Sequence, residues 1–250
     1  MRPHEYDTMR GVEDQHWWYR AQRDMVVRDL RPLLKEQADA AILDAGCGTG
    51  GMLQRLREAF PAARLSGVDF SAAAVARTTA RGFSGICQGS INDLPFSNAS
   101  ADIIISLDVL YHEGVEEAAA LAACRRVLKP GGTLILNLPA YDVLRGSHDL
   151  AVSGVRRYRP VALRRLLESA GFTVTALHAW NGWLFFPILL ARQLSRLRPV
   201  RQSSQIQGDL RPSPPWLHAL LGPICALDTR LSRRLRSPLG TSIYVLARSP

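Results

Sequence analysis

Short apolar runs alternate with amphipathic stretches through the first half of the chain, and this alternation limits the fold more than any other feature. The runs have the length of strands, and the stretches between them carry apolar residues at helical spacing. Strands alternating with helices predict an α/β fold: a mainly parallel sheet, covered on both faces, that binds ligands where its strands end. The expected strands are 41–44, 64–69, 85–88, 102–107 and 133–138, and the expected helices are 52–59, 72–81 and 115–128.

Two helical parts flank this alternation. Residues 14–34 have one apolar and aromatic side, typical of a helix, and we expect 1–40 to form an N-terminal helical lid. The segment 181–240 combines apolar helical pieces with prolines and arginines, and because structureless loops of that length are uncommon in compact domains, it predicts a helical insertion. The core then comprises 41–180 and 241–250, with a loop over 139–159, a helix over 160–170, and strands starting at Gly171 and Thr241.

Composition limits the class of protein. At 250 residues and 47% hydrophobic, the chain can bury one large core. No apolar run reaches the ~18 residues of a spanning helix, and the polar first residues lack a signal-peptide core, so we expect a cytoplasmic protein without a transmembrane segment. The four cysteines form no CxxC pair and have no metal-like spacing, so no metal site is predicted.

The charge is distributed unevenly. Residues 1–150 carry 16 Lys+Arg against 19 Asp+Glu, whereas residues 151–250 carry 15 against 3. The basic second half could attract an anionic acceptor, an acidic partner, nucleic acid or an anionic membrane, or it could be a solvated surface. The apolar run beside arginines in 181–199 is equally open: it could cover a pocket, form a homodimer, make a peripheral membrane contact or be a buried helix.

Four glycines lie within six residues in the sequence AILDAGCGTGGML, between the first expected strand and the first expected helix. A strand-to-helix turn without side chains lets a ligand approach the main chain and the helix N-terminus. The spacing fits both GxGxG and GxGxxG, so the motif alone leaves a dinucleotide and S-adenosylmethionine (AdoMet) open. Asp44, two residues before Gly46, would repel a pyrophosphate but suits the cationic amino and sulfonium groups of AdoMet.

A second acid ends the next expected strand. In SGVDFS, the Asp69 carboxylate can accept both hydroxyls of a ribose, and Phe70 could lie on an adenine face. A nicotinamide cofactor and AdoMet both contain such a nucleoside, so Asp69 does not choose between them. The structural alternative is that Asp69 or Ser71 caps the helix that follows.

Four motifs stand in a familiar order: LDAGCGTG, GVDFS, GSINDLPFSNASADIIISLDVLYH and RRVLKPGGTLILNLPA. Together they resemble the class I AdoMet-dependent methyltransferases, above all the small-molecule branch of ubiquinone and menaquinone biosynthesis and natural-product tailoring. The resemblance implies a Rossmann-like, seven-stranded sheet with an antiparallel last strand. It also implies methyl transfer from AdoMet to oxygen or nitrogen of a small-molecule acceptor by direct displacement.

Three alternatives remain at this point. One is a nicotinamide-dependent oxidoreductase, which Asp44 disfavours, and another is a catalytically inactive AdoMet-binding protein. The third is a nucleic-acid methyltransferase, disfavoured because the sequence has no NPPY-type base-flipping motif. We therefore expect a small-molecule acceptor and no nucleic-acid partner.

The resemblance also implies roles for residues. The glycine turn would hold the methionine end of AdoMet, Asp69 its ribose, and Leu107 would flank the methyl donor. The family often has aspartate at the adenine contact, where this chain has Ser90. The front segment resembles lids of some members and supplies Tyr19 and Arg23, of which the arginine could pair with the AdoMet carboxylate. The expected cofactor residues are Asp44, Gly46, Cys47, Gly48, Gly50, Asp69, Phe70, Ser90, Ile91, Asn92, Leu107, Tyr19 and Arg23.

A hydroxyl or ammonium acceptor must lose a proton during transfer. His112, just past the strand expected over 102–107, is the best-placed base because histidine titrates near neutrality. Tyr111 could orient the acceptor, and His148 is the second choice of base, although a lone histidine is more often structural. The candidates for binding an anionic acceptor group are Arg156, Arg157 and Tyr158, which otherwise flank a helix.

Overall fold

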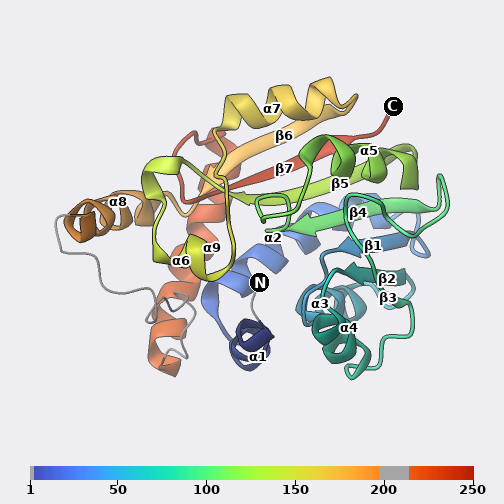
Figure 1. The fold of residues 1–250 in the computed structure, drawn as a ribbon, viewed down its shortest axis with the longest axis horizontal. Coiled ribbons are helices and arrows are strands. Elements are labelled where there is room, and N and C mark those ends of the chain that lie inside the picture. Colours follow the sequence, from blue (N-terminus) through green and yellow to red (C-terminus); the bar gives the residue numbers. More distant parts are fainter. Residues whose placement is uncertain (1–2, 197–213) are drawn as a thin grey trace.

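The computed structural model describes residues 3–196 and 214–250, whose strands form one seven-stranded sheet (Figure 1). The strand order is β3-β2-β1-β4-β5-β7-β6, and all strands run parallel except β7, which is antiparallel to both neighbours. The predicted α/β fold with an antiparallel last strand is confirmed, and that strand lies inside the sheet. The strands are β1 (Ala41–Ala45), β2 (Arg64–Asp69), β3 (Ile86–Gln88), β4 (Ala101–Leu107), β5 (Leu128–Pro139), β6 (Thr173–Trp180) and β7 (Ser242–Arg248).

The described helices are α1 (Pro3–Val12), α2 (Trp17–Leu34), α3 (Gly51–Ala59), α4 (Ala72–Thr79), α5 (Glu117–Val127), α6 (Ser147–Ala151), α7 (Pro160–Ser169), α8 (Gly182–Arg196) and α9 (Pro215–Leu235), with a 3-10 turn at Asp142–Leu144. Two buried clusters place them on the sheet. The helices α2, α3 and α9 share one cluster with Ile103 and Ile105, and α5 and α7 share the other with Ile104. Successive strand residues point to opposite faces, so the isoleucines of β4 serve both clusters.

The connections differ from the expectation in two places, before α2 and after β5. The helix predicted over 14–34 is present as α2, which begins at Trp17 because the His16 side chain caps it by accepting a hydrogen bond from the Trp18 N–H, and a separate helix, α1, precedes it. The loop expected over 139–159 contains the 3-10 turn and α6. The expected insertion 181–240 contains α8 and α9, while its residues 197–213 lie outside the described residues.

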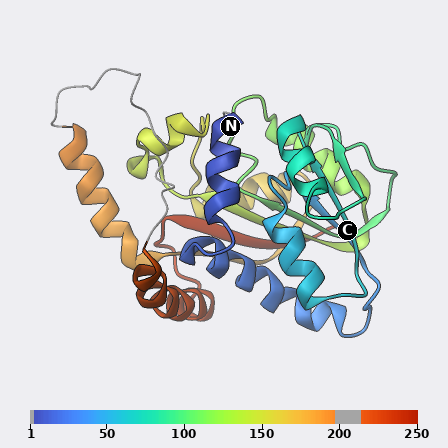
Figure 2. The ribbon, with the colours of Figure 1, turned by 90° about the horizontal axis from the view of Figure 1, so that it is seen from below.

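The strand order fixes where a ligand can enter. The chain goes outward from β1 through β2 to β3 and then returns to the other side of β1 as β4. The connections after β1 and after β4 therefore diverge, and they leave a crevice at the carboxyl ends of these two strands. Helix α8 stands away from the rest of the protein (Figure 2). Among the described residues, no helix is long and apolar enough to cross a membrane.

Candidate active site

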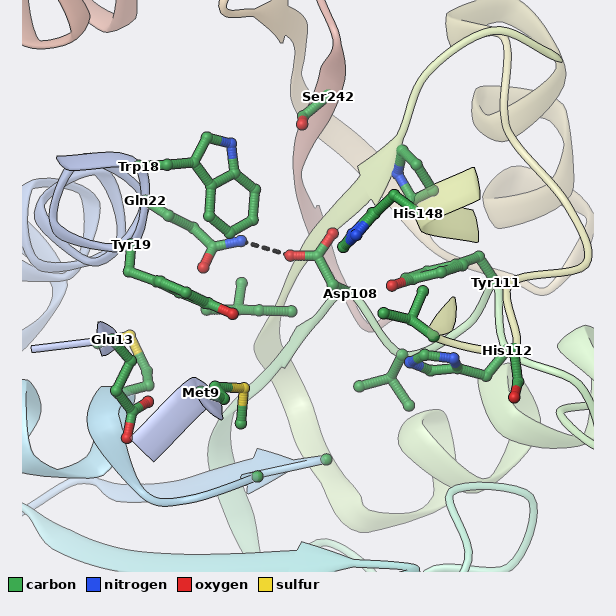
Figure 3. Close-up of a pocket in the computed structure, with 18 of the residues that line it drawn as sticks. Met9, Glu13, Trp18, Tyr19, Gln22, Asp108, Tyr111, His112, His148 and Ser242 are labelled. Atoms are coloured by element: carbon green, nitrogen blue, oxygen red, sulfur yellow. Dashed lines mark hydrogen bonds between the residues drawn. The ribbon is translucent and has the colours of Figure 1, made fainter. Parts of the chain in front are cut away.

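A cavity of about 800 Å³ opens at the carboxyl ends of β1 and β4. The glycine turn after β1 and the segment after β4 form its floor, and residues of α1, α2, α6 and α8 form its walls. Figure 3 shows side chains from these elements converging on it. The cavity is therefore built from segments that lie far apart in the sequence.

The glycine turn needs its glycines for conformation and for space. Gly46 has φ of +94° and Gly48 of +55°, values that residues with a side chain rarely adopt. A Cβ on Gly46 would lie 2.2 Å from Val109 Cγ2, and one on Gly48 would lie 2.7 Å from Met9 Cε. The turn leads directly into α3, so its main chain and the first N–H groups of that helix face the cavity.

Asp69 ties three elements to this turn. One carboxylate oxygen accepts the Gly48 N–H at 2.8 Å, and the other accepts the Ser71 N–H at 2.9 Å and the Tyr6 hydroxyl at 3.4 Å. The Ser71 side chain in turn caps α4. Burial raises the pKa of Asp69, and its two main-chain hydrogen bonds act against that rise. In this arrangement Asp69 organises the turn and the α1 contact.

Two further acids surround the glycine turn. Asp44 is fully buried, and burial, reinforced by the charges of Asp69 and Glu13, raises its pKa to about 8. Glu13 follows α1 and accepts hydrogen bonds from the Thr49 hydroxyl and the Arg81 guanidinium. Like charges at close range disfavour one another, so this acidic cluster of Asp44, Asp69 and Glu13 favours a cationic ligand group.

Arg23 of α2 contributes a cation beside the first residue of α3. Its Nη1 donates to the Gly51 carbonyl at 3.1 Å and to Asp14 at 3.4 Å, and its Nε donates to the Tyr19 carbonyl. Its Nη2 is buried without a hydrogen-bond partner among the described residues. A buried N–H group without an acceptor raises the free energy of the folded protein. The position of the Arg23 Nη2 therefore suits the carboxylate of a ligand.

Asp108 directly follows β4 and points into the cavity (Figure 3). It has φ of +59°, accepts the Gln22 side-chain N–H at 2.6 Å, and accepts Asn137 Nδ2 at 3.0 and 3.1 Å. The Asn137 side chain is itself fixed, because its Oδ1 accepts a hydrogen bond from the Trp180 Nε1–H at 2.8 Å. Burial raises the pKa of Asp108 to about 6, against the effect of its hydrogen bonds to Gln22 and Asn137.

The aromatic and imidazole groups lie beside this carboxylate. Tyr111 and His112 are stacked, with ring centroids 4.3 Å apart, and His148 of α6 lines the same cavity (Figure 3). Burial lowers the pKa of His112 to about 4, and its Nδ1 has no hydrogen-bond partner in the described part of the chain. His112 is therefore neutral and a weak base at pH 7.

The structure brings most of the predicted residues to one cavity. Of the others, Asn92 fixes the loop before α5 by bonding to the Gly114 carbonyl and the Glu116 N–H. Gly50 begins α3, with φ of +83°. The predicted residues that line the cavity are Asp44, Gly46, Cys47, Gly48, Asp69, Phe70, Ser90, Ile91, Leu107, Tyr19, Arg23, Tyr111, His112, His148 and Arg157.

The three residues predicted to bind an anionic acceptor are engaged within the protein. Arg156 pairs with Glu117 at 3.3 Å, and the Tyr158 hydroxyl donates to the Leu110 carbonyl; neither lines the cavity. Arg157 does line it, but its guanidinium holds Asp149 through two hydrogen bonds of 2.7 and 3.1 Å. In this arrangement these side chains fix the loop between β5 and α7.

Asp108, Gln22 and Glu13 line the cavity but were not predicted from the sequence. Asp108 could have been found, because it is the first polar residue after an apolar strand, at the edge where a parallel sheet binds its ligands. Gln22 and Glu13 carry no local signal: Gln22 is 86 residues from Asp108, and Glu13 is 36 residues from Thr49.

Residues 43–136 match the sequence family described as "Methyltransferase domain". The chain is 29% identical over 170 residues to a probable S-adenosylmethionine-dependent methyltransferase of Mycolicibacterium smegmatis, over 67% of this chain and 63% of the relative. It is 33% identical over 163 residues to trans-aconitate 2-methyltransferase of Deinococcus radiodurans (64% and 58%), and 31% over 142 residues to malonyl-[acyl-carrier protein] O-methyltransferase 1 of Coxiella burnetii (54% and 49%). The chain thus spans about half to three-fifths of the length of these relatives.

Solved structures share the fold at low identity. Geranyl diphosphate methyltransferase in complex with SAM superposes with a TM-score of 0.60 at 15% identity, over 92% of this chain and 85% of that one. The [4+2]-cyclase SpnF superposes with a TM-score of 0.55 at 19% identity, over 90% and 80%. Since the second is named for a different reaction, the fold alone does not define the chemistry.

Proposed function

We propose that this chain, which carries a class I AdoMet-dependent methyltransferase domain over residues 43–136, transfers the methyl group of AdoMet to oxygen or nitrogen of a small-molecule acceptor by direct displacement. One observation carries the proposal: the acidic cluster and the buried Nη2 of Arg23 meet around one glycine turn. A zwitterionic amino-acid end attached to a sulfonium needs this combination, with carboxylates for its cations and a guanidinium for its carboxylate.

The residues present fit AdoMet. When bound, it supplies a methyl group activated by a positive sulfur. Asp44 would face the cationic end, Arg23 would receive the carboxylate, and the bare main chain of the glycine turn would allow close approach. Asp69 already accepts three hydrogen bonds, of which the one from Tyr6 is the longest and is the one that a ribose hydroxyl would replace. Phe70 is largely exposed beside it and offers a face to adenine.

Asp108 is the base that we propose for the acceptor. Its pKa of about 6 leaves it mostly ionised at neutral pH and yet basic enough to take a proton from a positioned hydroxyl or ammonium group. Gln22 and Asn137 hold the carboxylate in place, so little reorganisation is needed. Tyr111, His112 and His148 then serve as positioning residues around the acceptor.

The walls beyond Asp108 support an acceptor with an apolar part. Leu144, Val152, Leu184 and Ile188 line that side of the cavity. One relative is named as a malonyl-[acyl-carrier protein] O-methyltransferase, and this supports oxygen as the atom that is methylated. The internal pairing of Arg156 and Arg157 gives little support to the expected anionic acceptor.

Calorimetry with AdoMet tests the cofactor site. Gly48→Val and Asp69→Ala should each weaken binding at least tenfold, whereas Gly131→Ala, at a positive-φ glycine with open space around it, and Asp93→Ala, at an exposed acid, should not. Because a bound cation lowers the pKa of Asp44 from about 8, binding near pH 7 should release up to one proton. The binding enthalpy should therefore depend on the buffer, and this dependence should vanish in Asp44→Asn.

Two outcomes would redirect the proposal. Binding of NADH with exclusion of AdoMet would favour the oxidoreductase alternative. Tight AdoMet binding without methyl transfer from labelled AdoMet to any acidic, hydroxylated or amino acceptor would favour a non-catalytic AdoMet-binding protein. Methyl transfer that is lost in Asp108→Asn would support the assignment made here.

A further inference from the structure

The last helix before β7, α9, leaves most of its large apolar side chains exposed. The buried residues of α9 are the small or polar Cys225, Thr229 and Ser232, and Leu217 and Leu221 are half-buried. Large apolar side chains follow the opposite face at intervals of three or four residues, so they form one stripe. These exposed residues, the α9 stripe, are Trp216, Leu220, Ile224, Leu227, Leu231 and Leu235.

The stripe is strongly exposed and free of acid. Trp216 is 66% exposed, Leu227 58% and Leu235 72%. Asp228 is the one acid on α9, and its carboxylate turns inward to accept the N–H groups of Asn181 and Gly182 at 2.6 and 3.0 Å. Contiguous apolar surface of this kind, on a helix that is otherwise basic, is unusual for a surface that faces only water.

Helix α8 likewise has one side turned to the protein and one exposed apolar side. Leu184 and Ile188 face the cavity, while Phe186, Leu190 and Leu194 are exposed at four-residue intervals. The helix has no acidic residue, and Figure 2 shows it standing away from the body. Both helices of the 181–240 segment therefore present outward leucines without negative charge.

A basic groove of about 570 Å³ runs between α2 and α9, beside the α9 stripe. Its arginines, Arg20, Arg28, Arg31, Arg55 and Arg230, are accompanied by one acid, Asp24, which pairs with Arg55 at 3.0 Å. The Nη2 of Arg28 is buried without a hydrogen-bond partner among the described residues, and its Nε lies 3.8 Å from Asp29. With five guanidinium groups against one acid in its lining, the groove favours an oxyanion such as a phosphate group.

We propose that the α9 stripe and the adjoining groove dock this protein on an anionic phospholipid bilayer, with leucines in the acyl boundary and headgroup phosphates at the arginines. An interfacial helix combines an apolar face with basic flanks in this way, and each arginine near an anionic surface adds about 1 kcal/mol, roughly fivefold in binding. This inference does not rest on the proposed function.

Two other partners fit less well. A second copy joined through α8 and α9 would bring arginines together with no outward acid on the described parts of these helices to pair with them. A nucleic acid could place its phosphates at the arginines of the groove. It would leave the leucines in water, because proteins contact nucleic acids mainly at the phosphates. A bilayer with anionic headgroups matches both the stripe and the groove.

Flotation with vesicles tests the proposal. The wild-type chain should float with phosphatidylcholine vesicles that contain phosphatidylglycerol, and bind pure phosphatidylcholine at least tenfold more weakly. The double variant Leu227→Asp/Leu231→Asp should lose at least tenfold in partitioning, and Arg230→Gln about fivefold, with the loss reduced at high salt. Both changes are at exposed side chains, so the fold should be kept.

Val161→Asp is the matched control, because Val161 is 64% exposed on α7, on the opposite face of the sheet. It should float like the wild type. AdoMet affinity, measured in parallel, should be unchanged in all variants, so that failure of docking is distinguishable from failure of the cofactor site. Absence of wild-type flotation, or equal flotation of the leucine variant, would overturn the proposal. So would a dimer in light scattering that the leucine variant converts to a monomer without any change in flotation.

Discussion

Asp108 and His112 lie in one short segment after β4, and burial acts on both, but it leaves them with different basicity. Desolvation disfavours the charged form of each group, so the pKa of the aspartate rises to about 6 and that of the histidine falls to about 4. At pH 7 both are in the base form, and the carboxylate is the stronger base. Residue type alone favours the histidine; the environment reverses that order.

Replacing the carboxylate should separate chemistry from binding. We expect Asp108→Asn to lower kcat by about 10²-fold with AdoMet affinity unchanged, because the amide cannot accept the proton. The wild-type rate should rise with pH through about 6 and then level off, and the residual rate of the variant should lack this rise. His112→Ala should also lower the rate, but less. Steady-state kinetics and calorimetry check both.

Asp142→Asn is the control for this prediction, since that carboxylate is 70% exposed in the 3-10 turn. It should leave the rate and the pH profile unchanged. A fully active Asp108→Asn enzyme would assign the proton transfer elsewhere or show that none is needed.

At the scale of elements, α1 is held on the glycine turn by few contacts. Glu13 joins the end of α1 to Thr49 in the turn and to Arg81 beyond α4, and both charged side chains are almost fully buried. Burial raises the pKa of Glu13, while the Thr49 hydrogen bond and the positive charge of Arg81 oppose the rise. Loss of one partner of a buried pair is costly, so this contact, together with the Tyr6–Asp69 hydrogen bond, holds α1 in place.

Glu13→Gln should therefore loosen α1 without unfolding the core. We expect amide hydrogen exchange in α1 to become at least tenfold faster, AdoMet to bind more weakly, and the midpoint of global unfolding to change little. Arg10→Gln is the matched change, because its pair with Asp14 is exposed and contributes little. Equal exchange rates in the two variants would argue against Glu13 as the anchor.

At the scale of the whole molecule, the buried histidines and the buried aspartates make the stability of the folded state depend on pH in opposite directions. His16, His112 and His178 all have a folded pKa of about 4, below the ordinary 6.5, so they favour unfolding as the pH falls below 6.5. Asp44 and Asp108 have folded values of about 8 and 6, above the ordinary 3.8, so they favour unfolding as the pH rises. Between pH 6.5 and 8 only Asp44, among these five, still carries its proton in the folded state.

Stability should therefore be greatest near pH 6 to 6.5. From pH 6.5 to 8 the free energy of unfolding should fall by about 2 kcal/mol, because the folded chain keeps the Asp44 proton that the unfolded chain has lost. Urea unfolding over this range measures the fall. Asp44→Asn should abolish it, and His178→Gln, away from the cavity, should leave it intact but reduce the loss below pH 6. Stability that still increases up to pH 8 would contradict this balance.

The sequence by itself determined the elements and the site at the carboxyl ends of the strands. The apolar runs, the glycine turn and the position of Asp69 are local or periodic signals, and physical chemistry reads them without knowledge of the rest of the chain. That is why the strand at 64–69, the helix that starts after Ser71 and the glycine turn between a strand and a helix could all be predicted before any contact was known.

Only the tertiary structure decided what surrounds these signals. It placed β7 between β5 and β6, brought Gln22 and Asn137 to Asp108, and turned the leucines of α9 outward. Each of these depends on which surfaces meet and how much water they exclude, and that is set by residues far away in the chain. The same carboxylate titrates near 4 in water and near 6 when buried, so its chemistry belongs to the fold and not to the residue.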